Sequence, residues 1–364
     1  MKSFFLLLVL TSLYTTANAA INVTNIQTDT IIHYPVTLLI GNGAAGPSLR
    51  VINHTPRADS RPTTVTVVDG RFKALVELIS GINIIELKSG SDTQTLNLTY
   101  HPDENDHLVR VIYMTGSDKD TGYQTPDKPG KDYAARLDTA VKLMQTFTAE
   151  RMNDAGYGRK TFALELDKRG KVVVHALAYP MKAQEMRDYT LTDYWKLYYD
   201  WLDKQFSYDN NKCLVVMAFT RFDPDQKKVY GHTALGGGGE GVFGSAGMFS
   251  WPKNIHDVER AFSDAAPVDG AKVHDDSAFR STNWGLAATT IGAMLHEMGH
   301  TFGLPHVADP ESIMSRGFDH FNRLFTVIEP AVRDGKNPTQ FTNNQIAHWD
   351  DASAKILSEC PWFR

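Results

Sequence analysis

Three histidines and a glutamate recur at fixed spacings in the segment HEMGHTFGLPH. Residues four apart share one face of a helix, so His296 and His300 can present their imidazoles to one ion, while Glu297 projects toward the open side of that ion. Gly303 can end the helix in a left-handed conformation. His306 follows three residues later, where it can return as a third ligand. The spacing therefore predicts a metal site with three neutral imidazole ligands.

Three protein ligands leave the fourth position of a tetrahedral zinc ion for water, which is the arrangement of catalytic rather than structural zinc sites. Zinc lowers the pKa of that water toward about 7, and a neighbouring carboxylate can take up its proton. We therefore expect one catalytic Zn²⁺ on His296, His300 and His306, with Glu297 as the general base. A bare H-E-x-x-H recurs by chance, but five specified positions in eleven carry much more information.

The complete pattern H-E-x-x-H-x-x-G-x-x-H resembles the signature of the metzincin clan of zinc metallopeptidases. Members of this clan place a methionine beneath the metal in a tight turn, and Met314 in ESIMSRG resembles that residue. The fuller pattern, ALGGGGEGVFGSAGMFSWP upstream and IMSRGFDHFNRLFT downstream, is similar to a zinc metallopeptidase family of fungi and bacteria. The resemblance implies hydrolysis of peptide bonds in a peptide or protein substrate.

One position departs from this resemblance. Astacin-like and serralysin-like members carry a tyrosine two residues after the methionine of the turn, where it can support the oxyanion, and this chain has Arg316. The Arg316 guanidinium could stabilise an oxyanion electrostatically, or it could pair with a carboxylate in the fold. His320 is a second candidate for oxyanion support.

A run of four glycines lies upstream of the motif, where metzincins place the edge strand of the substrate cleft: Gly236, Gly237, Gly238 and Gly239. An edge strand can bind an extended peptide by strand addition, and glycine permits close backbone approach. A mobile surface loop is the alternative interpretation, and the sequence leaves both open.

The elements that would position these residues alternate between strands and helices over residues 104–364. One predicted helix lies in YAARLDTAVKLMQTFTAERMNDAGYG, where Gly156 and Gly158 supply its end and apolar residues recur at helical spacing (Leu137, Val141, Met144 and Phe147). A second, WGLAATTIGAMLHEMGHTFG, runs directly into the histidine motif. This order predicts an α/β (α+β) catalytic domain, metzincin-like by the resemblance above.

Residues 20–103 have a different character. Short runs with alternating apolar and polar residues are separated by Gly, Pro, Asn and Asp, which predicts a small antiparallel β-sandwich of immunoglobulin-like type. Such a domain could bind a glycan or another surface ligand. The alternative function is therefore a non-catalytic surface-binding or adhesion protein with a structural zinc site. A structural site does not need a general base, so the presence of Glu297 beside the histidines argues against this alternative.

Residues 1–19 read as a secretory signal peptide, with Lys2 before an apolar run and Ala17-Asn18-Ala19 as the cleavage site. No other apolar run approaches the ~20 residues that span a bilayer, so we expect a mature chain without an integral membrane segment. The expected location is extracellular, or periplasmic in a Gram-negative bacterium. A net charge of only −5 does not indicate a nucleic-acid partner.

The two cysteines, Cys213 and Cys360, could form a disulfide in an oxidising compartment. Sequence alone does not establish their geometry, so the pairing is left open.

Overall fold

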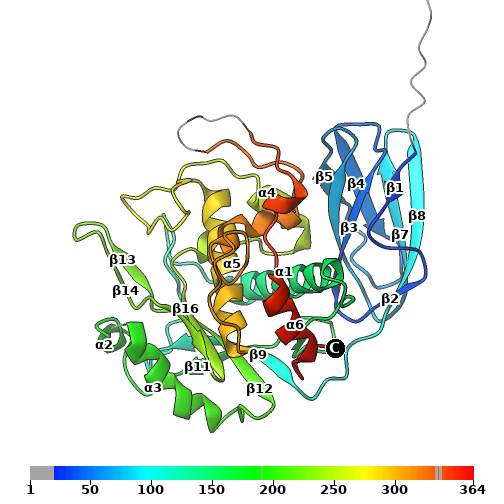
Figure 1. The fold of residues 1–364 in the computed structure, drawn as a ribbon. Coiled ribbons are helices and arrows are strands. Elements are labelled where there is room, and N and C mark those ends of the chain that lie inside the picture. The colour runs from blue at the N-terminus through cyan, green and yellow to red at the C-terminus, as the bar shows by residue number, and fades with distance from the viewer. Residues whose placement is uncertain (1–19, 190, 333–334, 336–337) are drawn as a thin grey trace, which may run out of the picture.

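The computed structural model describes residues 20–189, 191–332, 335 and 338–364. The predicted signal peptide lies outside the described residues. Figure 1 shows the strands of residues 20–103 gathered at one side of the molecule, next to a larger part in which helices pack on a mixed sheet.

Two sheets build the N-terminal part. The first has the strand order β1-β3-β6, from β1 (Asn22–Val23), β3 (Val36–Asn42) and β6 (Phe72–Glu77). The second has the order β2-β8-β7-β4-β5, from β2 (Thr30–Ile32), β8 (Asp92–Tyr100), β7 (Gly81–Ser89), β4 (Ser48–Asn53) and β5 (Thr63–Thr66). Buried side chains from both sheets, such as Leu39, Phe72, Leu49 and Leu87, share one apolar core. This is the predicted two-sheet sandwich.

The sandwich differs from its prediction in two respects. It is not wholly antiparallel, because β2 pairs with β8 in parallel. It also contains β4, a strand of sequence SLRVIN that local sequence does not mark off from the segments around it. β4 alternates buried and exposed residues between two antiparallel neighbours, so its place is decided by pairing with strands distant in sequence. The immunoglobulin-like class stays a prediction.

A six-stranded sheet forms the centre of the larger part. Its path is β10-β9-β12-β16-β15, and β11 also pairs with β9. The strands are β9 (Leu108–Thr115), β10 (Ala163–Leu164), β11 (Val174–Ala178), β12 (Asn211–Met217), β15 (Ala234–Gly237) and β16 (Glu240–Gly244). All neighbours on this sheet are parallel except β15, which pairs antiparallel with β16 at the edge. A separate hairpin joins β13 (Arg221–Asp223) to β14 (Lys228–Tyr230).

Helices cover both faces of this sheet. On one face, α1 (Tyr133–Asp154) and α5 (Asn283–Thr301) pack against Leu214 and Val216 of β12. On the other face, α2 (Ala183–Met186) and α3 (Leu191–Asp203) pack against Val215 and Met217. The remaining helices are α4 (Val258–Ala261), α6 (Asp351–Glu359) and the 3₁₀ segments η1 (Met248–Ser250), η2 (Ile255–Asp257), η3 (Gly317–Leu324) and η4 (Asn343–Gln345). The mixed α/β prediction is confirmed, and all four apolar α1 residues named above are buried.

The two parts meet along α1. Val36, Leu38 and Leu75 of the three-stranded sheet belong to the same apolar core as α1 and α5. Beside them, the fully buried Lys142 ammonium lies 2.9 Å from a carboxylate oxygen of Glu77 on β6 and 3.0 Å from one of Asp138 on α1. A buried charge is tolerated only when it is paired in this way, so the pairing fixes how the sandwich sits on α1.

The two cysteines are free thiols in the structure. Cys213 packs into the core on the α3 face of the sheet, whereas Cys360 packs against the core on the α1 and α5 face. The disulfide left open by the sequence is therefore not formed here, because the two residues pack against opposite faces. Within the described residues, no helix has the length and apolar character needed to cross a membrane.

Candidate metal centre

Helix α5 carries the first half of the histidine motif. The Thr282 hydroxyl accepts a hydrogen bond from the Gly285 N–H and caps the start of the helix. At the other end Gly303 has φ +87°, the left-handed conformation that glycine adopts without a Cβ clash. The Leu304 N–H then donates to the Gly299 carbonyl and the Gly303 N–H to the His300 carbonyl, which is a Schellman cap. The cap turns the chain back toward the helix, as the sequence predicts.

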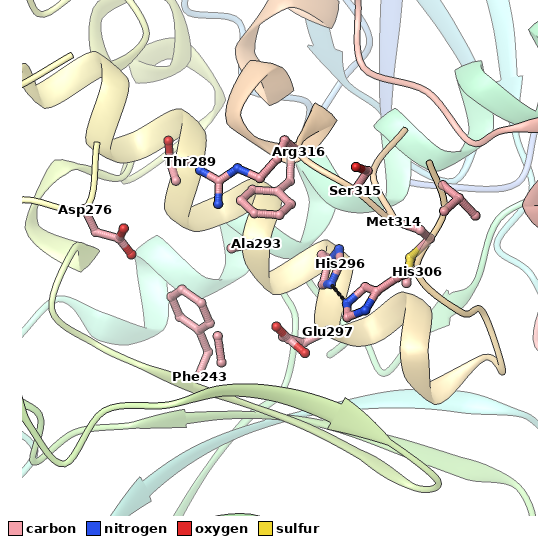
Figure 2. A pocket seen from close by; sticks show the side chains of 13 residues that line it. Phe243, Asp276, Thr289, Ala293, His296, Glu297, His306, Met314, Ser315 and Arg316 are labelled. Atoms are coloured by element: carbon pink, nitrogen blue, oxygen red, sulfur yellow. Dashed lines mark hydrogen bonds between the residues drawn. The ribbon is translucent and has the colours of Figure 1, made fainter. Parts of the chain in front are cut away.

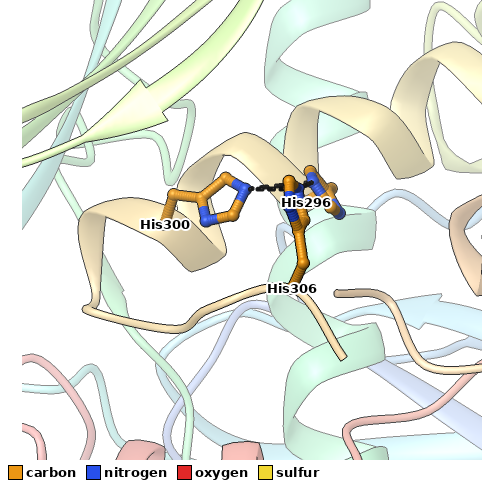
Figure 3. Close-up of side chains that lie close together, drawn as sticks. All are labelled: His296, His300 and His306. Atoms are coloured by element: carbon orange, nitrogen blue, oxygen red, sulfur yellow. Dashed lines mark hydrogen bonds between the residues drawn. The ribbon is translucent and has the colours of Figure 1, made fainter. Parts of the chain in front are cut away.

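This turn brings the three histidines together. Figure 2 shows His296, Glu297 and His306 at one end of a cavity, and Figure 3 shows the three imidazoles converging. Their Nε2 atoms are 3.1 Å (His296 to His306), 3.1 Å (His296 to His300) and 3.2 Å (His300 to His306) apart. Ligand nitrogens at about 2.0–2.1 Å from a tetrahedral zinc are about 3.3–3.4 Å apart. The triangle of nitrogens therefore fits a zinc ion with little rearrangement.

Hydrogen bonds on the far side of two rings fix their orientation. The His296 Nδ1–H donates to the Ile313 carbonyl at 2.7 Å, and the His300 Nδ1–H donates to the Leu304 carbonyl at 2.8 Å. Each bond assigns the proton to Nδ1 and leaves the Nε2 lone pair free for a metal. Burial also lowers the pKa of His296 to about 4 and lowers the pKa of His300, so both rings are neutral at pH 7. The site offers the deprotonated nitrogens that zinc requires.

Glu297 is buried beside the triad and lines the cavity. Burial raises the pKa of its carboxyl group to about 7, and a hydrogen bond from the Gly236 N–H acts in the opposite direction. Gly236 lies so close that a Cβ added to it would be 2.0 Å from the Glu297 carbonyl oxygen. The glutamate is thus held between its own helix and strand β15.

The four glycines form this strand and its turn. Gly236 and Gly237 end β15, and Gly238 and Gly239 lead into β16. Within the described part of the chain, β15 has a neighbouring strand on one side only. Gly236 and Gly237 therefore belong to an edge strand that packs onto α5, whereas Gly238 and Gly239 form the turn that follows it.

Met314 lies in a tight turn directly against α5. The Ser315 N–H donates to the Ser312 carbonyl, and the Met314 N–H donates to the Ser312 hydroxyl. Met314 is fully buried, and a Cβ added to Gly299 would be 2.4 Å from its sulfur atom. The Ile313 carbonyl of the same turn accepts the hydrogen bond from His296 Nδ1–H. The turn therefore both packs against α5 and orients the His296 ring.

The two residues considered for oxyanion support are both paired with carboxylates. Arg316 lines the cavity, but its guanidinium contacts Asp319 at 2.7 Å and lies over the Phe318 ring at 4.6 Å. His320 lies outside the residues that line the cavity, with its Nδ1 2.8 Å from a Glu311 oxygen. The structure does not bring His320 to the site, and Arg316 adopts the ion-paired alternative.

We expect Arg316→Gln to reduce kcat/KM on a peptide substrate by less than tenfold. The Arg316 side chain is 63% exposed and engaged with Asp319, so it is not aimed at a fixed point beside the histidines. A preorganised oxyanion donor would instead contribute about 10²–10³-fold in kcat. Steady-state kinetics on one fluorogenic peptide distinguish an ion-paired Arg316 from an oxyanion donor. A loss of more than a hundredfold would show that Arg316 supports the oxyanion.

The cavity also contains residues that the sequence interpretation missed. It has a volume of about 450 Å³, and its further lining residues include Ala234, Phe243, Asp276, Thr289, Ala293 and Phe318. Thr289 and Ala293 precede His296 by seven and three positions, so helical spacing on α5 could have identified them. Asp276 lies in the loop before α5, and no local pattern indicates it.

A family model described as "Putative peptidase family" matches residues 20–364. A protein of Schizosaccharomyces pombe named as a putative zinc metalloproteinase is 31% identical over 82% of this chain and 53% of its own length. A Saccharomyces cerevisiae protein of the same description is 26% identical over 74% of this chain and 44% of its own length. The chain thus spans about half the length of these relatives.

Among solved structures, catalytically inactive OgpA from Akkermansia muciniphila in complex with an O-glycopeptide is similar at a TM-score of 0.44. The two chains are 20% identical, and the match covers 72% of this chain and 62% of OgpA.

Proposed function

Since the chain belongs to the family described as "Putative peptidase family", we propose that it is a zinc-dependent endopeptidase of metzincin type. The observation that carries the proposal is the convergence of the Nε2 atoms of His296, His300 and His306 within 3.2 Å of one another, with Glu297 beside them in an accessible cavity. Relatives named as zinc metalloproteinases support the choice of metal.

A zinc ion on the three histidines would supply a Lewis acid for the scissile carbonyl and lower the pKa of water. The side chains and backbone groups of the protein transfer the proton and hold the ligands in place. Glu297 removes the proton of the nucleophilic water and returns it to the leaving amine. The Gly236 N–H holds the Glu297 carboxylate, and the Ile313 and Leu304 carbonyls keep His296 and His300 in the tautomer that can bind metal.

The edge of β15 is proposed as the place where substrate binds. Strand β15 runs past Glu297, and its free edge can pair with an extended peptide through main-chain hydrogen bonds. Since the substrate then lies along the strand, its scissile bond passes the three histidines and its side chains reach the neighbouring cavity.

The proposal includes the arrangement expected from the sequence. Residues 1–19 direct secretion, residues 20–103 form an immunoglobulin-like sandwich that could bind a glycan or surface ligand, and residues 104–364 form the catalytic domain. A non-catalytic protein with a structural zinc is less well supported. Structural zinc sites are closed by a fourth protein ligand, whereas the described residues here offer three histidines beside an accessible cavity.

Removal of the metal tests the proposal. The purified chain is expected to contain about one equivalent of zinc by elemental analysis and to cleave casein or a peptide library. Dialysis against a chelator should abolish cleavage, and one equivalent of Zn²⁺ should restore it. Casein cleavage that survives complete zinc removal, or a zinc-loaded chain that cleaves nothing in the library, would contradict the proposed function.

A further inference from the structure

We propose that the cavity beside the three histidines takes a lysine or arginine side chain of the substrate, and that Asp276 is the residue that selects it. The inference rests on the proposed peptidase function and names its substrate class. In Figure 2 the Asp276 carboxylate points into the cavity from the end opposite His306. The cavity therefore extends from the reacting groups at one end to a carboxylate at the other.

The walls between these ends are largely apolar. Ala234 and Phe243 come from strands β15 and β16, and Ala293 and Phe318 come from α5 and η3. Lysine and arginine combine an apolar methylene stem with a charged tip, so the stem can lie along these walls while the tip reaches a carboxylate. A shorter or wholly apolar side chain would leave that carboxylate without a partner.

Within the described residues the Asp276 carboxylate has no hydrogen-bond or ion-pair partner. Its electrostatic neighbour is the His232 ring, whose charged form it favours. The adjacent Asp275 differs, since one of its oxygens accepts from the Ser277 N–H at 3.2 Å. Burial lowers the pKa of the nearby His232 to about 4, so that ring is neutral at pH 7. Among the described residues that line the cavity, Arg316 is the arginine, and it is paired with Asp319. A negative charge thus remains available to a ligand.

The backbone around Asp276 is held in place. Val273 and Ser277, on either side, are buried. The Ser277 hydroxyl accepts from the Ser281 N–H at 2.6 Å, and its carbonyl accepts from Arg280 Nε at 2.9 Å. Non-glycine residues with left-handed φ follow directly: Ala278, Phe279 and Ser281. Such conformations persist only where the surroundings enforce them, so the backbone that carries Asp276 is held at the end of the cavity.

The test compares matched internally quenched peptides that carry lysine, norleucine or glutamate at one position on either side of the cleaved bond. Norleucine has the same stem as lysine without the charge. The zinc-loaded wild-type chain should cleave the lysine peptide at least about tenfold more efficiently than the norleucine peptide at one of these positions, as expected for a charge-assisted hydrogen bond. Asp276→Asn should reduce this lysine-to-norleucine ratio at least tenfold. The control Asp275→Asn should retain it.

A ratio near one in the wild type, or a ratio that survives Asp276→Asn, would overturn the assignment of Asp276. Binding separates this failure from failure of the proposed function. Fluorescence anisotropy with the Glu297→Gln chain should give a lower Kd for the labelled lysine peptide than for the norleucine peptide, and adding Asp276→Asn should remove the difference. If the wild type cleaves no peptide but this binding preference is present, the peptidase proposal fails while the pocket stands; equal Kd values reject the pocket.

Discussion

Glu297→Gln is expected to lower kcat/KM on a peptide substrate by about 10²–10⁴-fold while the chain keeps its zinc and its fold. The substitution removes only the ability to accept a proton. The glutamine side chain has nearly the same volume and can still accept the hydrogen bond from the Gly236 N–H. Because burial already disfavours the charged form of Glu297, a neutral amide should not lower the midpoint of thermal unfolding. Kinetics, zinc content and thermal unfolding should all be measured on the same preparation.

Glu311→Gln provides the matched control. Glu311 follows the third histidine closely in sequence, but its carboxylate pairs with His320 outside the cavity. The control should keep most of the wild-type activity. Equal activities of Glu297→Gln and wild type would remove Glu297 as the base and leave the zinc site without its proposed catalytic role.

The centre of the site could be predicted because its geometry is local. His296 and His300 are four residues apart on one helix, and Gly303 ends that helix with a left-handed cap that only a few residues determine. The spacing of these residues therefore implies the convergence of His306 with them. Arg316 and Asp319 are also close in sequence, three residues apart at the start of η3, so their ion pair could have been inferred from the same kind of spacing.

Features that depend on distant segments could not be predicted in this way. Asp276 comes to the cavity through a loop that is anchored on the core by Val273, and nothing near Asp276 in sequence marks it. Whether Cys213 and Cys360 pair could not be predicted either, because the answer depends on which face of the sheet each one packs against. Cys213 lies on a strand that has an apolar core on both sides. The parallel pairing of β2 with β8 joins residues more than sixty positions apart. In each case tertiary packing, rather than local propensity, decides the outcome.

Gly236→Ala is expected to lower activity by about a hundredfold and to destabilise the chain by about 1–3 kcal/mol. The new methyl group would be 2.0 Å from the Glu297 carbonyl oxygen and 2.9 Å from its Cα, so either β15 or α5 must move by about an ångström. That movement displaces the carboxylate that the Gly236 N–H now holds. Urea unfolding should give the loss of stability, and kcat on a quenched peptide should give the loss of positioning.

Gly237→Ala is the matched control, because it adds the same methyl group at the next position of the strand. Successive residues of a strand point to opposite faces, and a Cβ at Gly237 would meet no atom within 4 Å. Gly237 also lacks a positive φ, so alanine fits its backbone and should leave stability unchanged or raise it by up to about 1 kcal/mol. If the two variants lose activity equally, the loss comes from the conformation of β15 or from its pairing with substrate, and not from the contact with α5. A loss confined to Gly236→Ala means that the contact between β15 and α5 positions Glu297.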